Sequence, residues 1–68
     1  MHKVSVIIPN YNRANIIGET IQNILNQELQ PYEIIVVDDG STDNSIAVIE
    51  SFGSSVILLK QTNKEQLV

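Results

Sequence analysis

The sequence predicts an α/β fold in which three parallel strands alternate with two helices. Three short apolar segments rich in β-branched residues, at 3–8, 33–37 and 55–60, have the composition of buried strands. In the two segments between them, apolar residues recur at helical spacing. Crossover connections of this length make the strands parallel and the connections right-handed. The resulting βαβαβ order is half of a doubly wound, Rossmann-like sheet.

A short loop separates the first strand from the first helix. Lys3–Ile8 is almost entirely apolar, which predicts a central strand, and Pro9 ends it. A helix is predicted from about Asn15 to Glu28, and it stops before Pro31 because the residue preceding a proline avoids the helical conformation. The apolar stripe of this helix, expected to face the sheet, consists of Ile17, Ile21, Ile24, Leu25 and Leu29.

The second helix is expected to begin close to the end of the second strand. Ser41 or Thr42 can act as its N-cap, and Asp43 would then lie in the first turn, where the helix dipole favours a negative charge. Gly53 is expected to end the helix. The buried face of the helix consists of Ile46, Ile49 and Phe52, flanked by Val48.

Length and composition limit the classes of protein that fit. The chain has 68 residues and no cysteine, which excludes a disulfide framework and a thiolate zinc site. A core of this size rarely supplies more than about 3–5 kcal/mol of stability. A parallel sheet also needs helices on both faces, and this chain is too short to provide them. We therefore expect residues 1–68 to form an incomplete, truncated part of a larger domain.

The charge pattern argues against a nucleic-acid partner, and the lengths of the apolar runs argue against a membrane-spanning segment. Lys and Arg number 4 against 8 for Asp and Glu, the net charge is −4, and no basic stripe is present. No apolar run approaches the roughly 18 residues that a membrane-spanning helix requires, and the pattern of a signal peptide is missing. We expect no nucleic-acid partner and a cytoplasmic location. Any association with the inner face of the membrane would involve regions outside this chain.

The apolar run of the second strand ends in two carboxylates, a glycine and a hydroxyl residue, which are Asp38, Asp39, Gly40 and Ser41. Ligands of open parallel sheets bind outside the carboxyl ends of the strands, so both aspartates are expected where a ligand would be held. The alternative is an acidic turn whose side chains only cap the following helix. The residues alone leave both interpretations open.

The loop after the first strand, Pro9–Arg13, contains no glycine. Dinucleotide-binding proteins of this topology need glycines there so that the backbone can approach a pyrophosphate, which argues against a nicotinamide or flavin cofactor. Tyr11 can stack on a base, a contact worth about 1–3 kcal/mol, or it can pack on the edge of the sheet. The pattern favours a nucleoside ligand whose phosphates are neutralised by another group, usually a divalent metal.

Three spaced motifs in this order resemble the start of a family 2 glycosyltransferase: VSVIIPNYN at 4–12, IQNILNQ at 21–27 and EIIVVDDGSTD at 33–43. The resemblance implies a GT-A fold and transfer of a sugar from a nucleotide-diphosphate sugar donor to an unknown acceptor, in polysaccharide or glycolipid synthesis. It places Tyr11 beside the base and Asp39 on the base or ribose, with Asp38 in support. The nucleotide-binding residues it implies are Pro9, Tyr11, Asn12, Glu19, Asp38, Asp39, Gly40 and Ser41.

The resemblance also implies what this chain lacks. The Asp-x-Asp metal motif, the catalytic base and the acceptor-binding half of the family follow later strands. We therefore expect Mg or Mn in the full-length enzyme but no metal bound by this chain alone, no catalytic residue in it and no turnover. The family's Asn-x-Gly element after the third strand is matched by Asn63 and Lys64, whereas Glu65 stands where glycine is expected.

Other classes of protein fit less well. An EF-hand count that begins at Asp39 puts Asn44 at the position that requires glycine, and a strand precedes the loop instead of a helix. A phosphoacceptor receiver domain needs its acidic pair after the first strand, where Pro9 and Asn10 stand. The remaining alternative is a non-catalytic fragment or nucleotide-binding module with no activity of its own.

Overall fold

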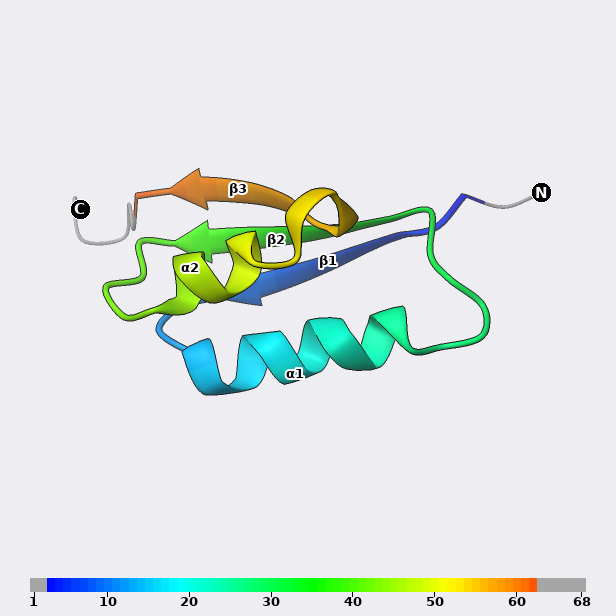
Figure 1. The fold of residues 1–68 in the computed structure, drawn as a ribbon. Helices are drawn as coiled ribbons and strands as arrows, with labels where there is room; N and C mark the ends of the chain where they lie inside the picture. Colours follow the sequence, from blue (N-terminus) through cyan, green and yellow to red (C-terminus); the bar gives the residue numbers. More distant parts are fainter. Residues whose placement is uncertain (1–2, 63–68) are drawn as a thin grey trace.

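The computed structural model describes residues 3–62 and has three parallel strands that alternate with two α-helices (Figure 1). This confirms the predicted α/β class and the βαβαβ order. The predictions for Asn63, Lys64 and Glu65 concern residues outside the described range. The elements are β1 (Ser5–Asn10), α1 (Ala14–Leu25), β2 (Glu33–Asp39), α2 (Ser45–Glu50), the 3₁₀ helix η1 (Gly53–Ser55) and β3 (Ile57–Gln61).

The strand order within the described sheet is β1-β2-β3, so β2 is the central strand. The prediction that the first strand is central is therefore wrong for this part of the chain. Only alternate residues of β1 face the helices, and Ile7 on the opposite face is 65% exposed. In the register of the sheet, Asn10 pairs with Asp38, and Asp38 pairs with Lys60. Their carboxyl ends therefore meet at one edge of the sheet.

Helix α1 ends at Leu25, three residues before the predicted end. The side-chain amide of Gln30 donates hydrogen bonds to the carbonyls of Ile24 (3.3 Å) and Leu25 (2.9 Å). Neither carbonyl has a partner within the helix, and that of Ile24 also accepts from the Gln27 N–H (3.2 Å), so residues beyond the helix satisfy both. Leu29 falls outside the helix and is 87% exposed, so its assignment to the apolar stripe is wrong.

Helix α2 begins at Ser45, later than predicted, and neither Ser41 nor Thr42 caps it. Asp43 lies ahead of the helix instead of in its first turn. The hydroxyl of Ser41 is already bonded to the end of β2, which holds the chain in a loop up to residue 44. After α2 ends, Gly53 adopts a φ of +61° at the start of η1, a conformation that favours glycine.

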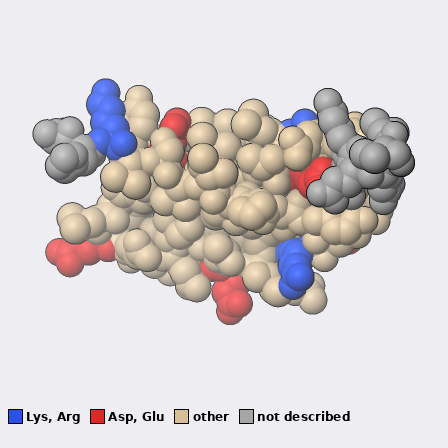
Figure 2. Space-filling model, turned by 180° about the vertical axis from the view of Figure 1, so that it is seen from behind, with Lys and Arg blue, Asp and Glu red and all other residues tan. Residues whose placement is uncertain are grey.

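The core lies between the helices and one face of the sheet. Its buried members are Ile17, Ile21, Val36 and Ile49. On the other face, Ile57 is 44% and Leu59 51% exposed, and no helix among residues 3–62 covers them. The view from behind shows charged side chains mainly towards the margins of this side of the molecule (Figure 2). Both described helices therefore lie on the same face of the sheet, and the opposite face presents apolar side chains.

The contact between the helices depends on Gly18, because a Cβ atom there would lie 3.0 Å from Val48 Cγ1. Replacing glycine by alanine inside a helix gains up to about 1 kcal/mol in helix propensity. The stiff, β-branched Val48 side chain cannot easily move aside, which offsets that gain. We expect Gly18→Ala to stabilise the Val48→Ala variant by about 1 kcal/mol and to stabilise the wild type less or not at all. Urea unfolding of the four chains measures this, and equal effects in both backgrounds would contradict a tight contact.

Candidate functional site

Two buried polar side chains meet where β1 and β2 end. Asn10 and Asp38 are partners in the strand register and are 4% and 2% exposed. Asn10 Nδ2 donates a hydrogen bond of 2.8 Å to Asp38 Oδ1. Buried polar groups are costly unless they are paired, so this bond joins the ends of the two strands.

Asp38 receives further hydrogen bonds from the loop that follows it. Ser41 Oγ donates to Asp38 Oδ1 (2.6 Å), and the Ser41 backbone N–H donates to Asp38 Oδ2 (2.9 Å). Burial raises the pKa of Asp38, but the bonds from Ser41 and Asn10 favour the charged form and together hold the pKa below its usual range. Asp38 is therefore a carboxylate that faces inward and organises the loop.

Asn12 joins the loop after β1 to the loop after β2. Its backbone has a φ of 51°, a left-handed conformation that asparagine tolerates better than most residues. Its N–H donates to Ser41 Oγ (2.8 Å). Its side-chain Oδ1 accepts from the backbone N–H groups of Thr42 (2.7 Å) and Asp43 (3.3 Å). Each loop thus donates hydrogen bonds to the other.

Asp43 stands at the start of both helices. Its Oδ2 accepts from the N–H of Ala14, the first residue of α1 (3.1 Å), and its Oδ1 from the N–H of Ser45, the first residue of α2 (2.9 Å). The hydrogen bond from the Ser45 side chain, followed by these backbone bonds, lowers the pKa of Asp43 although burial acts in the opposite direction. Ser45 Oγ also accepts from the Arg13 N–H (3.2 Å). We call the bonded set the carboxyl-edge network: Asn10, Asn12, Asp38, Ser41, Asp43 and Ser45.

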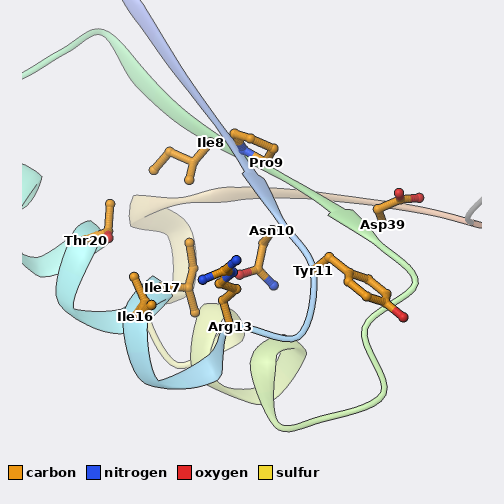
Figure 3. Close-up of a pocket in the computed structure, with 9 residues that line it drawn as sticks. All are labelled: Ile8, Pro9, Asn10, Tyr11, Arg13, Ile16, Ile17, Thr20 and Asp39. Atoms are coloured by element: carbon orange, nitrogen blue, oxygen red, sulfur yellow. The ribbon is translucent and has the colours of Figure 1, made fainter.

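A pocket of about 320 Å³ lies beside this network, between the end of the sheet and the first turns of α1. Figure 3 shows Tyr11 and Asp39 at one end of it and Ile16 and Thr20 at the other. No hydrogen bond from a residue in the described range 3–62 reaches the Asp39 carboxylate. The pocket therefore combines an apolar floor, an aromatic ring and an unengaged carboxylate. Its lining is Ile8, Pro9, Asn10, Tyr11, Arg13, Ile16, Ile17, Thr20 and Asp39.

The eight residues assigned to nucleotide binding fall into three groups. Pro9, Tyr11 and Asp39 line the pocket. Asn12, Asp38 and Ser41 belong to the carboxyl-edge network, and Gly40 forms the turn beside them with a φ of 79°. Glu19 is exposed on α1 and does not line this pocket.

Three polar residues of the pocket were missed by the sequence argument: Asn10, Arg13 and Thr20. Thr20 follows Ile17 by three residues on α1, so helical periodicity could have found it, whereas Arg13 precedes the helix. Among the described residues, no carboxylate lies within ion-pair distance of the Arg13 guanidinium. The pocket therefore carries one cation and one carboxylate.

Residues 3–62 offer no group of three His, Cys, Asp or Glu side chains that could hold a metal ion. The carboxylates of Asp38 and Asp43 are occupied by N–H and O–H donors, which leaves only Asp39 at this edge of the sheet. The described residues therefore do not fit a divalent metal. Within the same range, none of the helices has the length and apolar character needed to cross a membrane.

Comparisons with known proteins agree with the motifs. The model of the family described as "Glycosyl transferase family 2" matches residues 5–68. The chain is 44% identical over 64 residues to glycosyltransferase GlyG of Streptococcus pneumoniae, covering 90% of this chain and 21% of that protein. It is 35% identical over 65 residues to a poly(ribitol-phosphate) beta-glucosyltransferase of Bacillus spizizenii, covering 88% of this chain and 10% of that protein.

A third relative is the GalNAc(5)-diNAcBac-PP-undecaprenol beta-1,3-glucosyltransferase of Campylobacter jejuni. Identity is 41% over 51 residues, which covers 75% of this chain and 16% of that protein. The chain thus spans about a fifth or less of the length of each of these three curated relatives.

The lowered pKa of Asp38 makes the fold sensitive to acid. A group whose pKa is lower in the folded state stabilises the protein above its unfolded-state pKa, and that contribution is lost as the pH falls through the folded-state pKa. We expect the free energy of unfolding to decrease below about pH 4. Asp38→Asn should reduce this dependence and cost about 1–3 kcal/mol at neutral pH, because buried donors lose their acceptor.

Urea unfolding between about pH 2.5 and pH 7 measures both effects of Asp38→Asn. Glu50→Gln is the matched control, because it removes the same charge from a side chain that is 58% exposed and forms only a surface ion pair. An unchanged pH dependence in Asp38→Asn would contradict the role of Asp38.

Proposed function

The chain belongs to glycosyl transferase family 2, and on that premise we propose that its pocket binds the nucleoside of a nucleotide-diphosphate sugar donor. The observation that carries the proposal is the Asp39 carboxylate, which accepts no hydrogen bond from residues 3–62, at the same end of the pocket as the exposed ring of Tyr11. A nucleoside offers a flat base and hydroxyl or imino donors, which are the groups that an aromatic ring and a carboxylate recognise.

The surroundings of this pair suit the same ligand. Ile8, Ile16 and Ile17 give an apolar floor, as in most small-molecule sites. The volume of about 320 Å³ is at the lower end of the range for such sites. A nucleoside held by this part alone would therefore bind weakly.

For the whole protein we propose transfer of a sugar to an acceptor in glycan synthesis, on the cytoplasmic side. The named relatives act as glycosyltransferases, and two of them carry glucosyltransferase names. In this proposal residues 1–68 contribute the donor nucleoside part. The catalytic base, the acceptor site and a divalent metal, Mg or Mn, belong to other parts of the whole protein.

The second candidate is a nucleotide-binding module without activity. It is favoured by one observation, namely that Asp38 and Asp43 are both used within the carboxyl-edge network. Among the pocket-lining side chains within residues 3–62, Asp39 is the only carboxylate. If it binds the nucleoside, none of these side chains is left as the carboxylate base of a displacement reaction. Both candidates share the nucleoside site, and they differ in whether the whole protein transfers sugar from the donor.

Asp39→Asn should weaken the binding of UDP or GDP about ten- to a hundredfold, since a hydrogen bond to a charged group contributes about 1.5–3 kcal/mol. Tyr11→Ala should weaken it less, through lost stacking. The measurement is a titration followed in nitrogen–proton correlation spectra. Glu19→Gln, which removes a carboxylate outside the pocket, serves as the control and also tests the role implied for Glu19. Unchanged affinity in both pocket variants would refute the site.

Arg13 is expected to contact the phosphates of the donor, because it is the cation of the pocket and has no carboxylate partner within residues 3–62. Arg13→Met keeps much of the apolar stem and removes the charge. It should lower the affinity for UDP about tenfold or more, since charge-assisted bonds to phosphate are strong, and leave that for uridine nearly unchanged. Titration of both ligands checks this, and an equal loss for uridine and UDP would contradict a phosphate contact.

A further inference from the structure

Asn12 connects the loop that carries Tyr11 to the loop that follows Asp39, and the proposed site depends on these two residues. It follows Tyr11 directly in the chain, and its side-chain oxygen reaches the backbone of Thr42 and Asp43, in the loop that follows Asp39. The motif resemblance places Asn12 among the residues that touch the nucleotide. In the structure its acceptor atom is instead turned towards protein backbone.

We propose that Asn12 is a positioning residue that fixes the Tyr11 ring relative to the Asp39 carboxylate, without contacting the nucleotide itself. This inference rests on the proposed nucleoside site for its functional meaning. Tyr11 and Asp39 lie at the same end of the pocket but on different loops (Figure 3). The separation of the two groups is therefore set by whatever holds the loops together.

The bonds through Asn12 are the shortest connection between those loops. Its backbone N–H lies 2.8 Å from Ser41 Oγ, and its Oδ1 lies 2.7 Å from the Thr42 nitrogen. Gly40, between Asp39 and Ser41, has a φ of 79° and the conformational freedom of glycine. If the bonds to Asn12 Oδ1 are lost, the loop after β2 keeps the bonds of Ser41 to Asp38 and of Asp43 to Ala14, but Thr42 loses its bond to the loop after β1.

Two properties of Asn12 can be separated by substitution. Its left-handed backbone suits glycine as well as asparagine. Asn12→Gly therefore keeps the backbone conformation and removes the side-chain acceptor Oδ1. Asn12→Asp retains an oxygen acceptor at the same distance from the backbone. Asn44→Gly is the matched control, because it makes the same change in the loop after β2 at a residue whose side chain forms no capping bond.

The first measurement needs no ligand. Heteronuclear NOE values of the backbone amides report order on the picosecond to nanosecond timescale. We expect Asn12→Gly to lower the values for Tyr11 and Thr42 while those of Ile21 and Val36 stay unchanged. Asn12→Asp should restore them, and Asn44→Gly should leave Tyr11 unchanged. Unchanged order at Tyr11 and Thr42 in Asn12→Gly, or a loss spread evenly over the sheet, would overturn the inference.

The second measurement separates positioning from direct contact. Asn12→Gly should weaken uridine binding about tenfold in the wild-type chain and have little effect in the Tyr11→Ala chain, because the group that it positions is then missing. Equal losses in both backgrounds would indicate a direct contact and overturn the inference. If the wild type binds no uridine, the proposed nucleoside site fails, whereas the order measurement still decides the positioning role.

Discussion

The buried carboxylate of Asp38 is the constraint on which the functional end of this molecule depends. A charge that is 2% exposed must find hydrogen-bond donors within the protein. It finds them in Asn10, at the end of the neighbouring strand, and in Ser41, in the following loop. Ser41 in turn accepts from Asn12, so the loops after β1 and β2 both take their shape from this one side chain.

The two adjacent aspartates have opposite surroundings because they lie on a strand. Successive side chains of a strand point to opposite faces, and β2 alternates between buried and half-buried residues up to its last position. Asp38 therefore faces the helices and becomes structural, whereas Asp39 points to the other face at the margin of the pocket and accepts no hydrogen bond from residues 3–62. Asp38 thus has a structural role, although it bonds the loop and does not cap the helix. Ligand binding by Asp39 stays a prediction.

The fold followed from local patterns, but the details of the site did not. β-branched runs and helical spacing were sufficient for the strand–helix order, because each pattern is local and reflects burial. The start of α1 depends on Asp43, which is 29 residues further along the chain, and no local capping rule could predict such a partner. The end of α1 depends on the Gln30 side chain. Arg13 could not be predicted because it precedes α1, where neither helical spacing nor a glycine pattern marks it.

The shared carboxylate of Asp43 has a consequence for how the chain can vary in length. Surface loops usually accept insertions at little thermodynamic cost. Here the loops after β1 and β2 are bonded to each other at residues 12 and 41–43, and both helices start on one side chain. An extra residue in either loop would move one helix start away from Asp43 while the other stays in place. The two loops therefore behave as one segment of fixed length, and grafting this edge onto another parallel sheet would require both to be transferred together.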